Sequence, residues 1–320
     1  MTFVDLAQKQ LIAPPQAGLE AAVGNTPLLP LRRITANLSS GVEVFAKAEW
    51  FNPSGSVKDR PALNILRTAL AHRKLEDGRR LLDSTSGNMG IAYATFGAAM
   101  GIPVTLAIPG NASPERLAIL RSLGAELILT DALEGSDGAI LAAQKLAAEQ
   151  PERYYYANQY NNPANWQAHY TTTGPEIARQ SHGRVTHFVA GLGTSGTLVG
   201  AARYLREYAP DIKIIAVQPD AAFHGLEGLK HMPTAIRPGI FDASLPDRTL
   251  EISTEVAYEM TLRLARQEGL FVGVSSGAAA AAALQAAAEL QEGAIVTIFP
   301  DAGYKYLSEK FWEAAGDIGN

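Results

Sequence analysis

Short β-branched runs alternate along the chain with longer segments that have helical periodicity. The runs that predict strands are 42–47, 80–83, 104–108, 126–129, 187–190, 212–217 and 294–299. Helical patterns fill the intervals, and two of them, 91–100 and 114–123, each stop at a glycine, as helix C-termini often do. This alternation predicts an α/β fold of two doubly wound domains with mainly parallel sheets.

The stretch 154–163 is aromatic and polar and has few helix signals. We place a domain junction there, because 320 residues suit two domains of ordinary size. The prediction is an N-terminal α/β domain over 1–158 and a C-terminal α/β domain over 159–320. Residues 1–45 are expected to pack on the second domain.

Four segments rich in hydroxyl groups and glycine follow extended stretches and precede helical ones. They are 52–60 (NPSGSVKDR), 84–90 (STSGNMG), 191–197 (GLGTSGT) and 273–277 (GVSSG). Ligands of parallel α/β sheets bind at the carboxyl ends of the strands, so all four segments can face one cleft. Lys58 in the first segment can form a Schiff base with an aldehyde, and helix N-termini bind anions. Together these parts suit a phosphorylated aldehyde.

The segment 191–197 allows a second interpretation. Its letters GLGTSG match the fingerprint of dinucleotide sites, and Asp220 lies near the place of the ribose-binding acid. The hydroxyls of Thr194, Ser195 and Thr197 instead suit a terminal phosphate monoester, which offers several oxygens. A nucleotide-binding protein and a tight turn without a ligand both remain alternatives.

The other candidate residues also have simpler interpretations. Lysines are usually solvated, so a reactive Lys58 requires burial that lowers the pKa of its amine. Serine, threonine and asparagine favour helix starts for local reasons, so 84–90 and 273–277 could be caps alone. The turn at 301–303 is most simply a turn.

Composition excludes several other classes of function. The net charge of −5 argues against nucleic acid or an anionic membrane surface as a partner. The chain has no cysteine, no HExxH pair, no GxSxG elbow and no Walker loop, so we expect no metal site and no serine-hydrolase chemistry. The start lacks an apolar signal segment and no run of about 20 apolar residues follows, which predicts a soluble, cytoplasmic protein.

Taken together, NPSGSVKDR, TSGNMG, GLGTSGT, GVSSGA and PDAGYKYLS closely resemble the cysteine synthase (O-acetylserine sulfhydrylase) family. These are pyridoxal-phosphate enzymes of fold type II, with a fold like that of the tryptophan synthase β-subunit. The resemblance covers 23–308 and looks most like the B-type enzymes, some of which accept O-phosphoserine. It implies pyridoxal 5′-phosphate as cofactor, small-molecule substrates and a homodimer.

The resemblance implies a role for each motif residue. Lys58 would be catalytic and bond covalently to the cofactor. The residues implied to contact the cofactor are Lys58, Asn88 at the ring oxygen, Gly193, Thr194, Ser195, Gly196 and Thr197 at the phosphate, and Ser275 at the pyridine nitrogen. The residues implied to bind the substrate are Thr85, Ser86, Gly87, Met89, Gln159 and Lys230.

Two of the substrate residues depart from the family pattern. Met89 stands where the family usually has threonine, which puts one hydroxyl contact in doubt. Lys230 stands near the expected place of an arginine in the B-type relatives. Lysine is a point charge without a bidentate fork, so we expect a looser contact with a substrate phosphate. A solvated surface lysine is the alternative.

The implied reaction is β-replacement on an activated serine, O-acetylserine or O-phosphoserine, with sulfide as nucleophile and L-cysteine as product. Lys58 would take the α-proton and return it. A neutral Ser275 at a helix N-terminus would not hold the pyridine ring protonated, which favours loss of a β-substituent over transamination. A cystathionine β-synthase that uses homocysteine and a serine or threonine dehydratase are the alternative enzymes.

Overall fold

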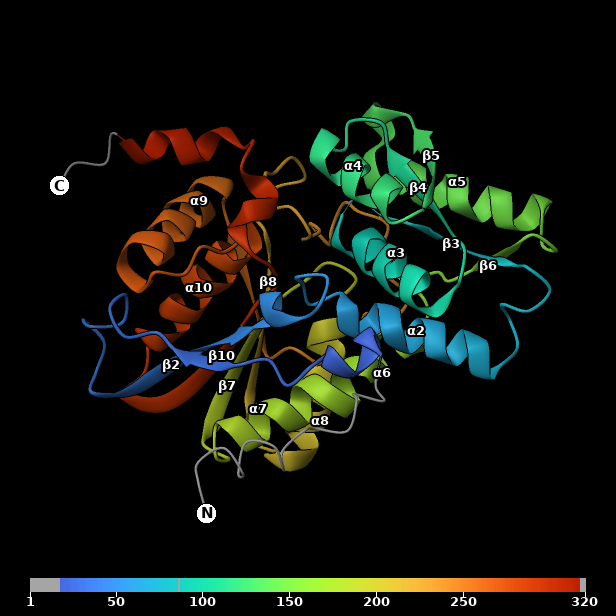
Figure 1. The fold of residues 1–320 in the computed structure, drawn as a ribbon. Helices are drawn as coiled ribbons and strands as arrows, with labels where there is room; N and C mark the ends of the chain where they lie inside the picture. Colours follow the sequence, from blue (N-terminus) through green and yellow to red (C-terminus); the bar gives the residue numbers. More distant parts are fainter. Residues whose placement is uncertain (1–17, 86, 317–320) are drawn as a thin grey trace, which may run out of the picture.

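The computed structural model describes residues 18–85 and 87–316, which form two sheets flanked by helices (Figure 1). The six-stranded sheet has the order β1 (Leu28–Pro30), β2 (Gly41–Ala48), β10 (Glu292–Phe299), β7 (Val185–Gly191), β8 (Lys213–Pro219) and β9 (Arg248–Ile252). The four-stranded sheet has the order β5 (Glu126–Thr130), β4 (Val104–Pro109), β3 (Arg80–Ser84) and β6 (Tyr154–Tyr156). Among these strands only β1 pairs antiparallel, with β2.

The α-helices fall into two sets that follow the sheets. Those of the first half are α2 (Asp59–Ala71), α3 (Asn88–Met100), α4 (Pro114–Ser122) and α5 (Gly135–Glu149). Those of the second half are α6 (Pro163–Ala168), α7 (Gly174–Gln180), α8 (Gly196–Tyr208), α9 (Thr254–Arg263) and α10 (Val274–Ala287). Short 3₁₀ and π turns connect them, among them η3 (Glu49–Phe51), η5 (His169–Thr173) and η7 (Gly303–Tyr306).

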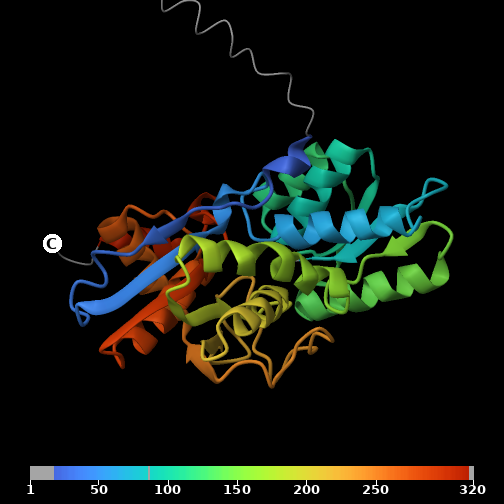
Figure 2. The same cartoon turned by 90° about the horizontal axis from the view of Figure 1, so that it is seen from below.

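Alternation along the strands places helices on both faces of each sheet. Successive side chains of a strand point to opposite faces. Accordingly, Leu81 packs in the cluster that includes residues of α2 and α3, while Leu82 packs in the cluster with α5. In the other sheet, Ile295 packs with α9 and α10, and Val296 packs with α7 and α8. The view from below shows α2 and α5 on opposite sides of the smaller sheet (Figure 2).

The seven predicted strands are confirmed as β2, β3, β4, β5, β7, β8 and β10, with ends that differ by at most two residues. Three strands escaped prediction, namely β1, β6 and β9. β1 and β6 have only three residues each, too few for a period-2 pattern to emerge. The two-sheet α/β class is also confirmed.

The N-terminal strands belong to the sheet of the second half. β2 pairs parallel with β10 over its whole length, from Gly41 opposite Glu292 to Ala48 opposite Phe299. The smaller sheet is built from strands within 80–156. The chain therefore begins in the larger sheet, forms the smaller sheet and then returns to the larger one. The domain boundary between residues 158 and 159 stays a prediction.

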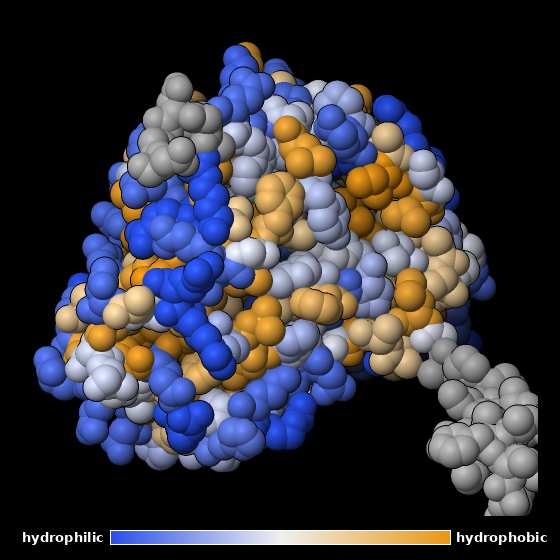
Figure 3. Space-filling view, turned by 60° about the vertical axis from the view of Figure 1, so that its left-hand side comes forward, coloured by the Kyte–Doolittle hydropathy of each residue, from blue (hydrophilic) through white to orange (hydrophobic). Residues whose placement is uncertain are grey.

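Apolar and polar side chains are interspersed on the face shown in Figure 3. The large apolar side chains that are most exposed include Phe223 and Leu133. Within 18–85 and 87–316, no helix combines the length and hydrophobicity that crossing a bilayer would require.

Candidate active site

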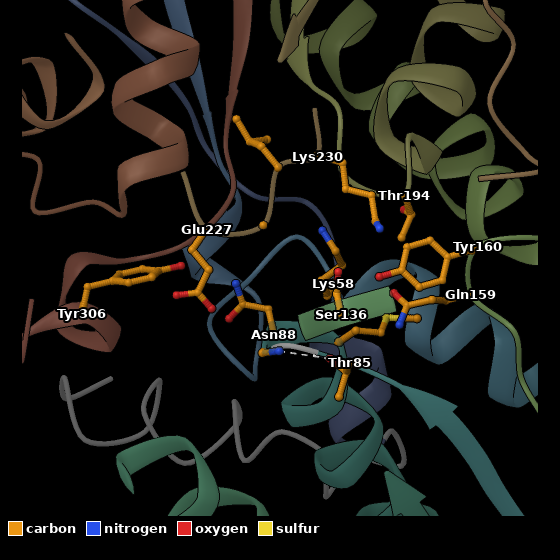
Figure 4. A pocket seen from close by; sticks show the side chains of 15 residues that line it. Lys58, Thr85, Asn88, Ser136, Gln159, Tyr160, Thr194, Glu227, Lys230 and Tyr306 are labelled. Atoms are coloured by element: carbon orange, nitrogen blue, oxygen red, sulfur yellow. Dashed lines mark hydrogen bonds between the residues drawn. The ribbon is translucent and has the colours of Figure 1, made fainter. Parts of the chain in front are cut away.

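A cavity opens where the two sets of elements meet, and the motif residues line it (Figure 4). A second hollow adjoins it and reaches toward β7 and α10. The predicted site residues that line one or both hollows are Lys58, Thr85, Gly87, Asn88, Met89, Gln159, Gly193, Thr194, Ser195, Thr197, Lys230 and Ser275. Gly196 is buried at the first position of α8, and Ser86 lies outside the described residues. The structure thus brings together segments that are far apart in sequence.

Lys58 precedes α2 and points its amine into the cavity (Figure 4). Burial lowers the pKa of this amine, and the negative charge of Asp301 opposes part of that effect. Among the described residues, Lys58 Nζ has no hydrogen-bond or ion-pair partner. A desolvated amine without a partner is the environment that makes a lysine nucleophilic. The interpretation of Lys58 as a solvated surface lysine is therefore wrong.

The loop between β7 and α8 is shaped by close contacts that only glycine permits. A Cβ on Gly193 would collide with the carbonyl oxygen of Gly228, and one on Gly196 would collide with the Asn165 amide. Asn165 Nδ2 also donates to Thr194 Oγ1 at 3.1 Å, which fixes that hydroxyl. Ser195 adopts a left-handed conformation, with φ of 69°, immediately before α8. Hydroxyls and backbone N–H groups at a helix start suit a phosphate monoester.

Thr197 on the first turn of α8 has a partner that the sequence analysis did not find. His169 Nε2 lies 3.3 Å from Thr197 Oγ1, and its Nδ1 lies 2.9 Å from Thr173 Oγ1. Burial lowers the pKa of His169 to about 3, so the ring is neutral at physiological pH. The histidine orients the hydroxyl without adding charge.

The start of α3 forms a second polar corner of the cavity. Thr85 Oγ1 accepts hydrogen bonds from the backbone N–H groups of Gly87 and Gly90, both at 3.1 Å (Figure 4). Gln159 reaches the same corner, where its Nε2 donates to the carbonyl oxygen of Ser84 at 2.5 Å. Met89 packs in the apolar cluster beneath α3 and is almost fully buried, so it supplies shape here and no hydroxyl.

Ser275 lies on the first turn of α10 and faces the second hollow. Gly273 is the N-cap of this helix, and no side chain caps it. The simpler interpretation of the serines as helix caps is therefore wrong for Ser275. Its hydroxyl is available to a ligand, because no residue in the described part of the chain bonds to it.

The turn at 301–303 is more than a turn, which corrects the simpler prediction. Asn88 Nδ2 donates to Asp301 Oδ2 at 2.7 Å, and Lys305 Nζ donates to Asn88 Oδ1 at 2.8 Å. Tyr306 from the same segment lines the cavity. No local pattern in PDAGYKYLS predicts a role for these residues. Only the contact with Asn88, 213 residues earlier, reveals one.

Lys230 is not a solvated surface lysine. Its side chain is 9% exposed, its Nζ lies 3.0 Å from Asp137 Oδ1, and it stands over the ring of Tyr160 at 5.1 Å. Asp137 belongs to α5, so the ion pair joins a helix of the first half to a residue that lines the cavity. A second pair joins the two halves in the same way, in which both terminal guanidinium nitrogens of Arg116, on α4, donate to the carboxylate of Glu227.

Comparison with known proteins agrees with this site. The family model described as pyridoxal-phosphate dependent enzyme matches residues 19–301. The chain is 52% identical over 291 residues to a cysteine synthase of Aquifex aeolicus, which covers 89% of each chain. It is 42% identical over 304 residues to cysteine synthase B of Escherichia coli, which covers 93% of this chain and 99% of the relative.

Solved structures give the same result. A cysteine synthase from Entamoeba histolytica superposes with a TM-score of 0.88 at 36% identity, covering 94% of this chain and 93% of that one. An O-acetylserine dependent cystathionine β-synthase from Helicobacter pylori superposes with a TM-score of 0.87 at 34% identity, covering 92% of this chain and 98% of that one. The chain therefore belongs to the cysteine synthase family of pyridoxal-phosphate dependent enzymes, with the fold of type II.

Proposed function

We propose that the protein is a cysteine synthase that replaces the β-substituent of an activated serine with sulfide to give L-cysteine. The observation that carries the proposal is the unpaired amine of Lys58 in a cavity faced by the starts of α3, α8 and α10. When bound, pyridoxal phosphate supplies an aldehyde that condenses with amines and an electron-withdrawing ring that acidifies the substrate α-proton.

The residues present fit that cofactor. The glycine-lined loop of Gly193 and Gly196, with the hydroxyls of Thr194, Ser195 and Thr197, would hold the phosphate. Ser275 would face the pyridine nitrogen and Asn88 the ring oxygen, with Lys58 at the aldehyde. Ser275 is neutral, and the positive end of α10 disfavours a proton on the ring nitrogen beside it.

Lys58 would also move the proton. Its lowered pKa leaves a share of neutral amine, which can accept the α-proton of the substrate at Nζ and later return it. Asp301 is fully buried nearby and would stabilise the ammonium between the two transfers.

The start of α3 would bind the substrate carboxylate. Thr85 and the backbone N–H groups near Gly87 provide the donors, and the helix dipole favours the negative charge. Gln159 would complete this corner after releasing the Ser84 carbonyl. Ser86 belongs to this set by sequence, and Met89 would form the apolar wall beneath it.

The preference for one donor substrate over the other depends on Lys230. With O-phosphoserine as donor, its ammonium would contact the phosphate, for which it must loosen its pairing with Asp137. With O-acetylserine no such contact is needed. We therefore propose O-acetylserine as the better donor and O-phosphoserine as the poorer one.

One experiment tests the proposal. Borohydride reduction of the protein with pyridoxal phosphate should fix the cofactor to the peptide that contains Lys58, and the Lys58→Ala variant should take no label. Each donor is then mixed with sulfide or homocysteine, and the products are identified by mass spectrometry. L-cysteine is expected, whereas cystathionine alone would assign the chain to the cystathionine enzymes. A label on another lysine would overturn the role of Lys58.

The proposal extends to the assembly and the compartment. The family resemblance supports a homodimer in the cytoplasm. Light scattering on the eluting protein should give twice the mass of 34.0 kDa, and fractionation of the source cells should recover the protein with cytoplasmic markers. A monomer at micromolar concentration would remove the dimer from the proposal.

A further inference from the structure

We propose that Asp301 and Lys305 are positioning residues that fix the amide of Asn88 with one Nδ2 proton free for the ring oxygen of the cofactor. This inference rests on the cofactor site proposed above. It assigns a role to half-buried Lys305 and a second role to buried Asp301, beyond the stabilisation of the Lys58 ammonium proposed above.

The amide of Asn88 lies between opposite charges. Its nitrogen donates to the Asp301 carboxylate at 2.7 Å, and its oxygen accepts from the Lys305 ammonium at 2.8 Å. The reversed amide would set N–H groups against the ammonium and the carbonyl against the carboxylate, so both contacts would be repulsive. An amide nitrogen carries two protons, and Asp301 takes one of them. The second proton remains for an acceptor in the cavity.

Asp301 and Lys305 are each fixed by a further hydrogen bond. Asp301 is fully buried, and its Oδ2 also accepts from the Tyr306 hydroxyl at 2.5 Å. Lys305 Nζ donates a further hydrogen bond to the carbonyl oxygen of Ser54 at 3.1 Å. Neither side chain can therefore turn away from Asn88 without losing another hydrogen bond.

The backbone that holds Asp301 is also hydrogen-bonded to the segment just before Lys58. Asp301 forms an isolated antiparallel bridge with Ser56, two residues before Lys58, and the Val57 N–H donates to the Pro300 carbonyl at 2.8 Å. Asn88 begins α3 and comes from the other set of elements. The contact of Asp301 and Lys305 with Asn88 thus sets the amide at a fixed position relative to the Lys58 amine.

The charges also favour a particular form of the ligand. A donated N–H stabilises a deprotonated ring oxygen over a protonated one, and the Lys305 ammonium at the amide oxygen polarises the amide so that its N–H is a stronger donor. The bound cofactor should accordingly absorb mainly in its visible, yellow band. Loss of the ammonium would let the amide reverse and would shift absorbance toward the near-ultraviolet band.

The test compares Lys305→Met with Lys305→Arg, and uses Lys145→Met as the matched surface control because Lys145 is largely exposed. In Lys305→Met we expect about tenfold weaker binding of pyridoxal phosphate, as loss of a charge-assisted hydrogen bond implies, and a lower ratio of visible to near-ultraviolet absorbance. Lys305→Arg should restore both in large part, and Lys145→Met should change neither. Thermal unfolding without cofactor identifies any variant that fails to fold.

The same substitution made in an Asn88→Ala protein distinguishes an effect of Lys305 through Asn88 from a direct effect of Lys305 on the cofactor. If Lys305 acts through Asn88, Lys305→Met should have no further effect on the spectrum in the Asn88→Ala protein. An equal shift in both backgrounds, or a normal spectrum and affinity in the single variant, would overturn the inference. A wild-type protein that binds no pyridoxal phosphate at Lys58 would instead refute the proposed function.

Discussion

Lys58 and Arg60 stand two positions apart at the start of α2, yet their surroundings are opposite. Arg60 Nε lies 2.7 Å from Glu49 and its Nη1 lies 2.7 Å from Glu176, with its side chain 1% exposed. Lys58 points the other way, into the cavity, where no described residue pairs with its amine. Two positions in the sequence thus separate a fully paired cation from an unpaired one.

The Arg60 side belongs to a buried network that satisfies itself. Lys47 Nζ donates to Glu176 at 2.6 Å and to Thr26 Oγ1 at 2.7 Å, and Thr26 donates to Glu49 at 2.7 Å. Burial of charges is costly unless they are paired and hydrogen-bonded. This network ties β2, η3, α2 and α7 together. Arg60 and Lys58 show that pairing, rather than burial alone, separates a structural charge from a reactive one.

The largest expected effect concerns the unpaired amine. Lys58→Ala should lower turnover of O-acetylserine and sulfide by about 10³-fold, because the group that moves the proton is gone. The free energy of unfolding should stay the same or rise, because a desolvated amine is removed. Initial rates and urea unfolding measure the two quantities. Turnover close to wild type would remove Lys58 from the mechanism.

Arg60→Met should give the opposite result. It leaves Glu49 and Glu176 buried with too little positive charge, so the free energy of unfolding should fall by about 3–5 kcal/mol. Arg73→Met is the control, because its pair with Glu76 is exposed and should change stability by less than about 1 kcal/mol. Urea unfolding of the three proteins decides, and equal stabilities would show that the network does not support the fold.

The paired side should also be sensitive to acid. Burial alone would raise the pKa of Glu49, but Arg60 and Lys47 outweigh it and lower that pKa to about 2 from 4.5. The stability that this carboxylate contributes is therefore present above pH 4.5 and lost as the pH falls toward 2, by about 3 kcal/mol. Unfolding free energies between pH 2 and 6 should decline less steeply in Glu49→Gln. Identical slopes would contradict the assignment.

The smallest expected effect sharpens the comparison with a third cation. Lys230 is paired with Asp137, so only part of its positive charge can act on a substrate phosphate. Lys230→Ala should lower kcat/KM for O-phosphoserine by about two- to tenfold, as an exposed or partly exposed ion pair implies, and should spare O-acetylserine. Asp137→Asn, which frees the ammonium, should favour O-phosphoserine. Equal losses for both donors in Lys230→Ala would make this lysine structural.

Local pattern predicted most of the fold because the central strands are buried on both faces. Runs such as 212–217 and 294–299 are each interrupted by only one polar residue, Lys213 and Thr297, so they stand out from the helical segments around them. β1 and β6 have only three residues each. All three missed strands, β1, β6 and β9, lie at sheet edges, where hydrogen bonds to a single neighbouring strand decide the conformation. The start of α3 was placed three residues late, because Asn88 and Gly90 look like loop residues by type.

The candidate site divides in the same way. The loop 191–197 and the serines of 273–277 are visible in sequence, because glycine and hydroxyl residues cluster there for a local reason. Glu227, Tyr160 and Lys305 carry no such signal. Their places depend on contacts across more than 100 residues, such as Arg116 with Glu227 and Lys305 with Asn88.

The sequence by itself determined the order of seven of the ten described strands and of the helices between them, the hydroxyl-rich loops and the family. These depend on side-chain periodicity and on residue types that act within a few positions of one another. Only the tertiary structure decided which charges are paired. The residues beside Lys58, Arg60 and Lys230 in the sequence do not show which of these cations has a buried partner. Arg60 is paired with Glu49 and Glu176, and Lys230 is paired with Asp137, all of them distant in sequence. Lys58 has no partner among the described residues.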